Sequence, residues 1–242
     1  MTDFLKAVIV TAIKEELAAV TSAIPKAGQH AAHLIRGGAG WSSATRAARD
    51  IATRQPAPQW ICSTGFSGGL ADGLNVGDIV LATELWGDQE AAITCLTPSR
   101  IELLSHALTA AKIRFHAGAT VTVTGAVTRT EDKRALGIKR NAIAVDMESY
   151  ALISTYQKMA AAPARAFVMR VISDSVDDAL PPEIAEFLDE KGNVRMGKVA
   201  RFMLGGPRHV KTLMELKARS DKAAAALTAA WKAVWPLLTG LA

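Results

Sequence analysis

The 242-residue chain contains only two cysteines, and no apolar run approaches the roughly 20 residues that a transmembrane helix needs. Cys62 and Cys95 have apolar neighbours, so we expect reduced thiols that fill the core rather than a disulfide. Residues 1–6 lack the basic and apolar segments of a secretory signal. These absences predict a cytoplasmic protein without a membrane-spanning helix.

Several chemical signatures are also missing. Two glycine-rich segments, 37–40 and 65–69, have neither the glycine spacing of a dinucleotide fingerprint nor the lysine of a P-loop. No G-x-S-x-G elbow is present, so the main signal of a serine hydrolase is absent. The five histidines have no Cys, Asp or Glu partners at ligand spacing, and we therefore expect no metal site.

Positive charge is concentrated at the end of the chain. Residues 191–242 hold ten Lys and Arg against two acidic residues, a balance of +8, whereas residues 1–190 hold 18 basic and 21 acidic residues, a balance of −3. Apolar residues recur at near-helical spacing over 207–235 with basic residues between them, which predicts an amphipathic helix. A helix packed on the sheet with a solvated basic face explains this pattern, and docking on an anionic membrane surface or an acidic partner is the alternative. No aromatic interleaving or known module supports nucleic-acid binding.

Short, almost wholly apolar segments alternate with helical patterns along the chain. We expect strands over 6–12, 34–36, 60–64, 76–81, 119–124, 142–145 and 166–172, and helices over 14–20, 42–54, 99–112, 131–137 and 148–158. Apolar strands separated by helices predict a three-layer α/β/α sandwich with a central mixed, mostly parallel twisted sheet. We expect one domain over 1–242, with a basic helical C-terminal extension from about residue 191.

Acidic residues follow two of the predicted strands. Glu148 comes shortly after one strand and Asp174 ends another, where open α/β sheets bind ligands. Two carboxylates from separate strands can divide the work on one substrate, one binding hydroxyl groups and the other moving a proton. We expect Asp174, at the end of an apolar strand, to lose enough hydration to keep a proton at neutral pH. Glu16 lies in the first turn of a helix, where a purely structural role is the simpler explanation.

The glycine-rich segments 37–40 and 65–69 each follow a predicted strand. Glycine has no side chain and tolerates positive φ, so both can be turns whose backbone amides approach a ligand closely, and a purely structural turn is the alternative for each.

Five segments, 11–16, 38–40, 64–80, 144–148 and 172–174, together resemble the nucleoside phosphorylase and nucleosidase superfamily, which includes the methylthioadenosine/S-adenosylhomocysteine nucleosidases. They occur in the family's order. Segments 177–182 and 188–192, with the basic tail, are similar to the hopanoid-associated branch, whose proposed substrate is adenosylhopane. The resemblance implies cleavage of the N-glycosidic bond of a purine nucleoside, with adenine as the base and a hopanoid-linked adenosine as the substrate. It also implies a homodimer without a cofactor, with inorganic phosphate as a co-substrate if the enzyme is a phosphorylase.

The resemblance also implies roles for individual residues. Asp174 is the acid that protonates the five-membered-ring nitrogen of the departing purine, and Ser173 supports it. Glu148 binds the ribose hydroxyls and Met147 packs against the sugar. Glu16 aligns with the carboxylate that activates water. The backbone amides near Ser67 and Gly68 line the nucleophile side, and Phe66 stands where nucleosidases commonly have a small polar residue.

The chain departs from the family pattern at several positions. Asp146 replaces a more usual Glu, and segment 124–129 lacks the customary Ser-Gly-Asp and aromatic residue of the base-contacting region. The phosphate-binding arginines of phosphorylases are not evident, which favours hydrolysis, although Lys14, Arg36 or Arg129 could bind an anion. Two alternatives stay open: a methylthioadenosine/S-adenosylhomocysteine nucleosidase, and a catalytically silent nucleoside-binding protein. The presence of all three candidate acidic site residues, Glu16, Glu148 and Asp174, argues against a catalytically silent protein.

Overall fold

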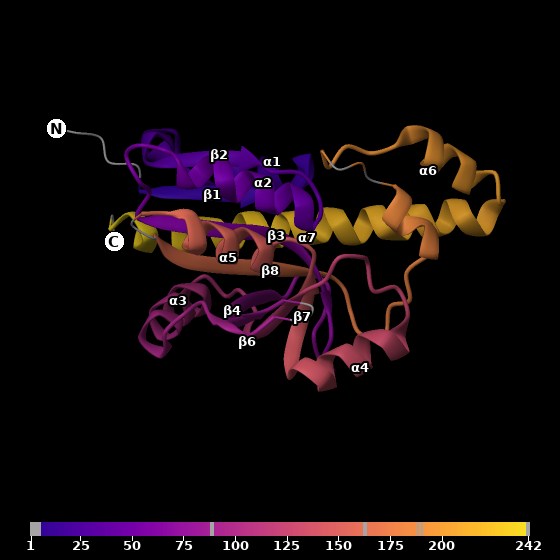
Figure 1. The fold of residues 1–242 in the computed structure, drawn as a ribbon. Helices are drawn as coiled ribbons and strands as arrows, with labels where there is room; N and C mark the ends of the chain where they lie inside the picture. The colour runs from indigo at the N-terminus through magenta and orange to yellow at the C-terminus, as the bar shows by residue number, and fades with distance from the viewer. Residues whose placement is uncertain (1–5, 88–89, 162–163, 188, 190, 241–242) are drawn as a thin grey trace.

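The computed structural model describes residues 6–87, 90–161, 164–187, 189 and 191–240 (Figure 1). The strands are β1 (Ala7–Thr11), β2 (Ala32–Arg36), β3 (Trp60–Gly69), β4 (Ile79–Trp86), β5 (Ile93–Thr94), β6 (Phe115–Thr122), β7 (Ala142–Asp146) and β8 (Arg165–Asp174). The helices are α1 (Lys14–Ala23), α2 (Trp41–Ala52), α3 (Pro98–Ala110), α4 (Thr130–Arg140), α5 (Ser149–Met159), α6 (Met196–Met203) and α7 (Pro207–Thr239), and the short 3₁₀ helices are η1 (Lys26–Ala31) and η2 (Pro182–Glu186).

The strands that the structure describes form one mixed sheet. Five strand pairs are parallel, namely β1–β2, β1–β3, β3–β8, β4–β6 and β6–β7, and three are antiparallel, namely β3–β7, β4–β5 and β4–β8. The predicted mixed, mostly parallel sheet is therefore confirmed. Strands β3, β8, β4, β6 and β7 also pair in a closed circuit, which the sequence did not indicate. Closing the circuit removes open edges from the centre of the sheet.

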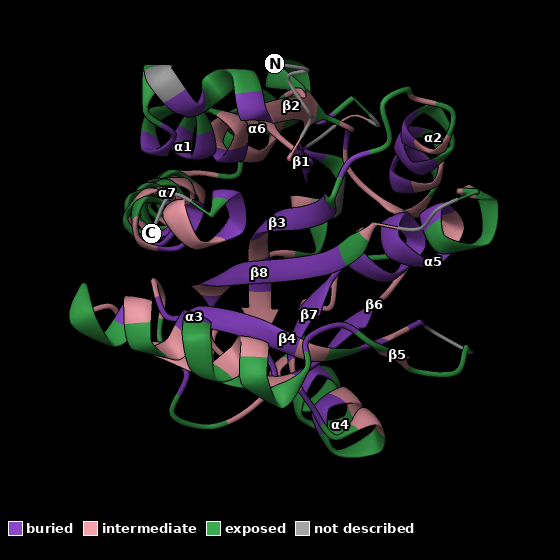
Figure 2. Cartoon of the chain, turned by 90° about the vertical axis from the view of Figure 1, so that its left-hand side faces the viewer, coloured by how far each residue is buried: buried purple, intermediate pink, exposed green. Residues whose placement is uncertain are grey.

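Helices cover both sides of the sheet, as predicted. Helices α1 and α7 pack together on one side and α2 and α5 on the other, with the buried strands β3 and β8 between them (Figure 2). The second half of α7 belongs to the core, because Ala223, Leu227, Trp231 and Val234 recur at helical spacing and are buried. The Trp231 indole N–H donates a hydrogen bond of 3.0 Å to Thr64 Oγ1 on β3.

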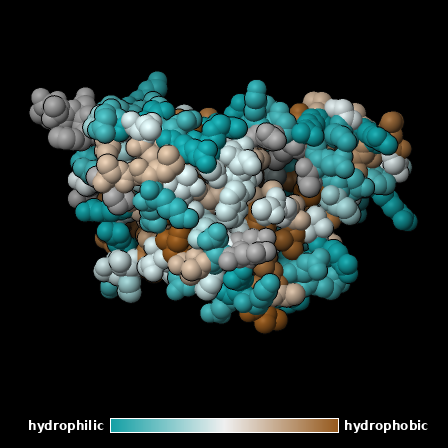
Figure 3. All heavy atoms as spheres, in the orientation of Figure 1, coloured by the Kyte–Doolittle hydropathy of each residue, from teal (hydrophilic) through white to brown (hydrophobic). Residues whose placement is uncertain are grey.

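The first half of α7 and the short helix α6 lie beyond the end of the sheet (Figure 1). Phe202 of α6 packs edge-on against Phe187 and His209, which holds α6 against α7. Hydrophobic residues are exposed among hydrophilic ones at this end of the molecule (Figure 3). Among the described residues, no helix has the length and apolar character that crossing a membrane requires.

The expected turn over residues 65–69 is wrong, because these residues form the last part of β3. Two of them, Gly65 and Gly68, must be glycine for a different reason, the close approach of two carboxylates. A Cβ atom on Gly65 would lie 2.4 Å from Glu16 Oε1, and one on Gly68 would lie 3.0 Å from Asp174 Oδ2. Glycine inside a strand often marks such a close approach.

The two cysteines are free and buried, as predicted, and burial raises the pKa of Cys95 to about 12.

Candidate functional site

A cavity of about 720 Å³ opens where β1, β3, β6, β7 and β8 end. Every site residue predicted from the sequence lines it: Glu16, Phe66, Ser67, Gly68, Met147, Glu148, Ser173 and Asp174. These residues come from four separate segments of the chain, and the sheet topology brings them together. The carboxyl ends of strands are the usual location of ligand sites in α/β proteins.

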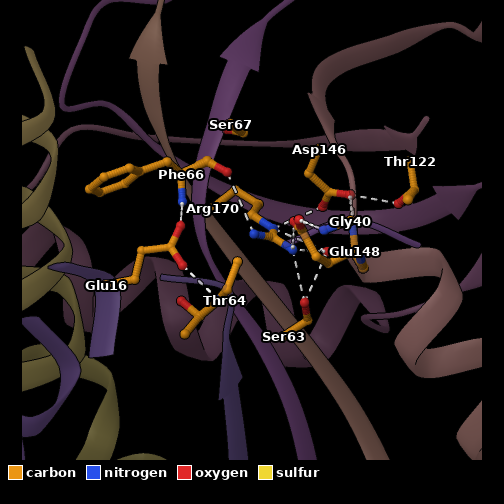
Figure 4. A network of polar contacts seen from close by, with 12 residues as sticks. Glu16, Gly40, Ser63, Thr64, Phe66, Ser67, Thr122, Asp146, Glu148 and Arg170 are labelled. Carbon is orange, nitrogen blue, oxygen red and sulfur yellow. Dashed lines mark hydrogen bonds and ion pairs between the residues drawn. The ribbon is translucent and has the colours of Figure 1, made fainter. Parts of the chain in front are cut away.

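Glu16 is buried in the first turn of α1 and faces the end of β3 (Figure 4). Its Oε2 accepts hydrogen bonds from the backbone N–H groups of Ala12 (2.7 Å) and Ile13 (3.1 Å), and its Oε1 accepts one from Phe66 (2.7 Å). Burial raises the pKa of Glu16, and the nearby Arg170 guanidinium partly opposes this. The contact with Phe66, 50 positions away in sequence, gives Glu16 a place in the cavity that helix capping alone would not require.

Glu148 occupies the N-cap position of α5. Its Oε1 accepts a hydrogen bond of 2.8 Å from the Gly40 N–H, and its Oε2 lies 3.7 Å from an Arg170 nitrogen (Figure 4). Burial raises the pKa of Glu148 to about 7, Arg170 opposes the rise, and the neighbouring Asp146 carboxylate adds to it. A carboxyl with this pKa changes charge near neutral pH.

Asp146 is buried beneath Glu148 and fixes the start of α5. Its Oδ1 accepts hydrogen bonds from Thr122 Oγ1 (2.6 Å) and from the backbone N–H groups of Glu148 and Ser149 (3.1 Å each). Its Oδ2 forms an ion pair of 2.8 Å with Arg170 Nε. Asp146, which is one methylene shorter than the Glu usual at this position, therefore holds the backbone of Glu148 in place.

Arg170 connects these groups and was not identified from the sequence. Its guanidinium is buried at the middle of β8 and donates hydrogen bonds to Ser63 Oγ (2.9 Å) and Ser149 Oγ (2.7 Å). Buried charges need partners, so an arginine inside the apolar run 166–172 is a signal that acidic groups lie nearby.

Asp174 does not lie in the purely apolar surroundings that the sequence suggested. The ammonium group of Lys133, on α4, lies 2.5 Å from Asp174 Oδ2, and both side chains are buried. Ser173 Oγ donates a hydrogen bond of 2.8 Å to Asp174 Oδ1 and also contacts the Ser67 carbonyl oxygen at 3.2 Å. The expected contact between Ser173 and Asp174 is therefore present, and Lys133 is an additional residue of the site. Nothing in the polar segment 130–134 distinguishes it in the sequence.

The rest of the cavity wall is mostly apolar. It includes Ile13, Trp41, Val123, Ala126, Val127, Leu180 and Ile184. Segment 124–129 corresponds to the region expected to contact the purine base, and three of its residues, Thr124, Ala126 and Val127, line the cavity. Among the described residues that line the cavity, Arg195 is the only Lys or Arg, so Lys14, Arg36 and Arg129 are not part of this lining. The described part of the chain also contains no cluster of His, Cys, Asp and Glu arranged to hold a metal ion.

The arrangement provides three carboxyl groups around one cavity, each in a different environment. Glu16 is held by backbone amides, Glu148 by an amide and a nearby guanidinium, and Asp174 by an ammonium and a hydroxyl. Carboxyl groups whose surroundings differ in this way can act separately as base, ligand and acid.

Comparison with protein families gives a match over residues 7–204 to the family described as Phosphorylase superfamily. No curated protein matches the chain.

Solved structures with the same fold include the futalosine hydrolase of Helicobacter pylori strain 26695, with a TM-score of 0.69, 17% identity, and coverage of 96% of this chain and 97% of that one. A 5′-methylthioadenosine/S-adenosylhomocysteine nucleosidase from Neisseria meningitidis, in complex with methylthio-immucillin-A, has a TM-score of 0.66 and 19% identity and covers 93% and 98% of the two chains. The corresponding enzyme from Streptococcus pneumoniae, with the inhibitor MT-ImmA, has a TM-score of 0.65 and 17% identity over 94% and 99%.

Proposed function

The chain belongs to the phosphorylase superfamily, and on this premise we propose that it cleaves the N-glycosidic bond of a purine nucleoside and releases the free base. Membership of the family confirms the predicted class of enzyme, which cleaves glycosidic bonds. Nucleosidases of this family act without a cofactor. The observation that carries the proposal is the convergence of Glu16, Glu148 and Asp174 on one cavity.

Cleavage of this bond leaves positive charge on the sugar and an electron pair on the base. Asp174 donates a proton to a nitrogen of the five-membered ring of the purine, so that the base leaves neutral. Ser173 supports the carboxyl through its contact with Oδ1. General acid catalysis of this kind contributes about 10²–10⁴-fold to the rate.

Glu148 in its ionised form accepts hydrogen bonds from the ribose hydroxyls, while Met147 packs against the sugar. Glu16 acts as the base that removes a proton from the attacking water. Its buried position supports this role, because burial raises the pKa of Glu16 and a carboxylate that binds a proton more strongly is a better base. The backbone near Ser67 and Gly68 lines the side from which water attacks.

Water, rather than phosphate, is the proposed nucleophile. Phosphorolysis needs cationic or amide groups that hold a phosphate dianion beside the sugar. The cavity lining offers Arg195 but none of Lys14, Arg36 and Arg129, among the residues that the structure describes. This lining supports hydrolysis and the release of ribose rather than ribose 1-phosphate.

The proposed substrate carries adenine and a large apolar group at its 5′ position, as a hopanoid-linked adenosine does. The cavity volume of about 720 Å³ and the apolar wall that includes Ile13, Val127, Leu180 and Ile184 support an extended apolar substrate. Such pockets bind apolar groups by removing their surface from water.

The α6–α7 surface supports access to a lipid-linked substrate. Its exposed apolar residues are Val194, Met196, Met203, Leu204, Val210 and Met214, and its exposed basic residues include Arg195, Arg201, Arg208 and Lys211. Apolar and basic side chains exposed together are typical of surfaces that bind anionic bilayers. We propose a cytoplasmic homodimer that docks reversibly on such a bilayer and does not bind nucleic acid.

A second candidate is a nucleosidase for a water-soluble substrate. The structural neighbours are named for 5′-methylthioadenosine, S-adenosylhomocysteine and futalosine, and these compounds are therefore the competing substrates to test.

The decisive experiment measures base and sugar release. The purified enzyme is incubated with adenosine, 5′-methylthioadenosine, S-adenosylhomocysteine, futalosine and a 5′-alkyl-extended adenosine, with and without phosphate. We expect free base and ribose, with the highest kcat/KM for the extended substrate. Asp174→Asn, prepared identically, should release base about 10²–10⁴-fold more slowly. Absence of base release from every compound would leave only the catalytically silent nucleoside-binding protein.

Membrane docking is tested separately by sedimentation with vesicles. Vesicles containing phosphatidylglycerol should bind the enzyme, and pure phosphatidylcholine vesicles should not. The triple variant Met196→Ser, Leu204→Ser, Met214→Ser should lose this binding while it keeps turnover of soluble substrates, because these side chains are 68%, 87% and 69% exposed. Equal binding of wild type and variant would contradict the proposed surface. Light scattering of the purified protein tests the homodimer.

A further inference from the structure

Lys133 lies against the proposed acid but is not among the residues that line the cavity. Its side chain is fully buried, and its Nζ lies 2.5 Å from Asp174 Oδ2. It also donates hydrogen bonds of 2.8 Å to the backbone carbonyl oxygens of Ser175 and Asp178. An ammonium group has three N–H donors, and here each has an acceptor. The geometry therefore fits a charged lysine held in one position.

Burial makes this contact significant for Asp174. An ion pair in a low-dielectric interior is stronger than one on the surface, and charge-assisted hydrogen bonds are about twice as strong as neutral ones. The surface ion pair between Lys217 and Asp221, 2.7 Å long and exposed on α7, provides the contrast, because such pairs contribute little. Lys133 thus exerts a fixed positive potential on one carboxyl oxygen of the cavity.

The two oxygens of Asp174 have different partners. Lys133 holds Oδ2, whereas Oδ1 contacts the hydroxyl of Ser173, which itself lines the cavity. The backbone of Gly68 also passes close to Oδ2, so that a Cβ atom added there would lie only 3.0 Å from it. Oδ1 is consequently the oxygen best placed to exchange a proton with a ligand.

We propose that Lys133 is a positioning residue for the cleavage reaction, which orients the Asp174 carboxyl and stabilises the carboxylate that proton transfer leaves behind. This inference rests on the proposed function. In each turnover Asp174 gives one proton to the base and Glu16 gains one from the attacking water, and exchange with bulk solvent then restores both groups. As the C–N bond breaks, its electron pair goes to the base and the Asp174 proton moves to a ring nitrogen. The ammonium keeps its own three protons and pairs with the resulting carboxylate, which makes Asp174 a more effective donor.

The test compares Lys133→Gln with Lys139→Gln, an exposed position on the same helix. Glutamine can still donate hydrogen bonds to the carbonyl groups but carries no charge. We expect Lys133→Gln to lower kcat about 10²-fold, the lower end of the range for the loss of one charge-stabilising group, with KM within threefold of wild type. The basic limb of the pH–rate profile should move to higher pH, because a carboxyl without an adjacent cation keeps its proton longer. Lys139→Gln should match wild type.

A purely structural role would give a different result. If Lys133→Gln lowers the melting temperature and kcat but leaves the pH profile in place, or keeps kcat within threefold, the proposal is overturned. Should the single variant not fold, Lys133→Gln is measured in an Asp174→Asn background, where it should leave the residual rate unchanged within threefold. A further tenfold fall there would also overturn it. A wild-type enzyme that releases no base contradicts the proposed function itself, whereas normal wild-type activity with an unaffected Lys133→Gln contradicts this inference alone.

Discussion

Two buried cations lie under the carboxyl groups of the cavity, and they are held in different ways. Arg170 is part of β8 and contacts side chains of β3, β7 and α5, including Ser63, Asp146 and Ser149. Lys133 belongs to the peripheral helix α4 and contacts one side chain, Asp174, together with two backbone carbonyls. Arg170 therefore ties several core elements together, whereas Lys133 acts mainly on one group of the site.

This difference separates stability from activity. Removing Arg170 leaves a buried carboxylate, Asp146, without its cation, at the point where three core elements meet. Removing the charge of Lys133 leaves a carboxyl that lines an open cavity and can take a proton from it. We expect the first change to affect folding most and the second to affect the rate most.

The largest effect is expected for Arg170→Met. Breaking a buried ion pair by removing one partner costs about 3–5 kcal/mol, and we expect a loss of this size in the free energy of unfolding measured with urea. Arg49→Met, at an exposed position on α2, should change it by less than about 0.5 kcal/mol. A loss below about 1 kcal/mol for Arg170→Met would remove the proposed contrast with Lys133.

Glu148→Gln should raise KM about 10- to 100-fold with a smaller effect on kcat. The amide replaces a carboxylate that accepts hydrogen bonds from the sugar hydroxyls, and hydrogen bonds to charged groups contribute about 1.5–3 kcal/mol. Steady-state kinetics on the best substrate measures both constants, with Glu102→Gln on the exposed side of α3 as the control. A fall in kcat at unchanged KM would instead place the role of Glu148 in the transition state.

The pH dependence of kcat/KM should reflect Glu148. Because its pKa is raised to about 7, its binding form is lost as the pH falls below that value. We expect kcat/KM to fall about tenfold per pH unit on the acid side. In Glu148→Gln this limb should lose the contribution of Glu148 and keep only that of Glu16, the proposed base. A profile that stays flat down to pH 5 in the wild type would contradict the assignment.

The same group affects stability in the opposite direction. The unfolded chain releases this proton near the ordinary value of 4.5, and the folded protein releases it near 7. Between these values the folded state binds more protons, so the contribution of Glu148 to the free energy of unfolding declines as the pH rises through this window. Activity and stability should therefore change in opposite senses between about pH 5 and 7.

Much of the fold was predictable because most strands and helices are indicated by local sequence patterns. The apolar runs 60–64 and 166–172 lie in β3 and β8, and the segment 207–235 with helical spacing lies in α7. The closed circuit of strands was not predictable, since antiparallel pairs such as β3–β7 join segments that are distant in sequence. Likewise, 65–69 was interpreted as a turn because glycine indicates turns in a sequence, whereas here it marks close contact with Glu16 and Asp174.

The two buried cations also differ in how far their roles could be predicted from the sequence. Arg170 interrupts an apolar strand, so its need for an acidic partner could be inferred from the sequence. Lys133 follows Glu131 and Asp132 in a polar helix, where an exposed lysine is the ordinary expectation. Its burial results from the packing of α4 next to the chain that leaves β8, and only the folded structure shows this contact.

The smallest effect is expected for Ser173→Ala, which sharpens the comparison between charged and neutral partners of Asp174. Ser173 donates a neutral hydrogen bond of 2.8 Å to Oδ1, and such bonds contribute about 0.5–1.5 kcal/mol. We expect kcat to fall about 2- to 10-fold, with a smaller shift of the basic limb than in Lys133→Gln. Ser105→Ala on α3 should have no effect, because Ser105 does not line the cavity. If Ser173→Ala equals or exceeds Lys133→Gln in both measurements, the hydroxyl on Oδ1 and not the ammonium on Oδ2 is the main support of the acid.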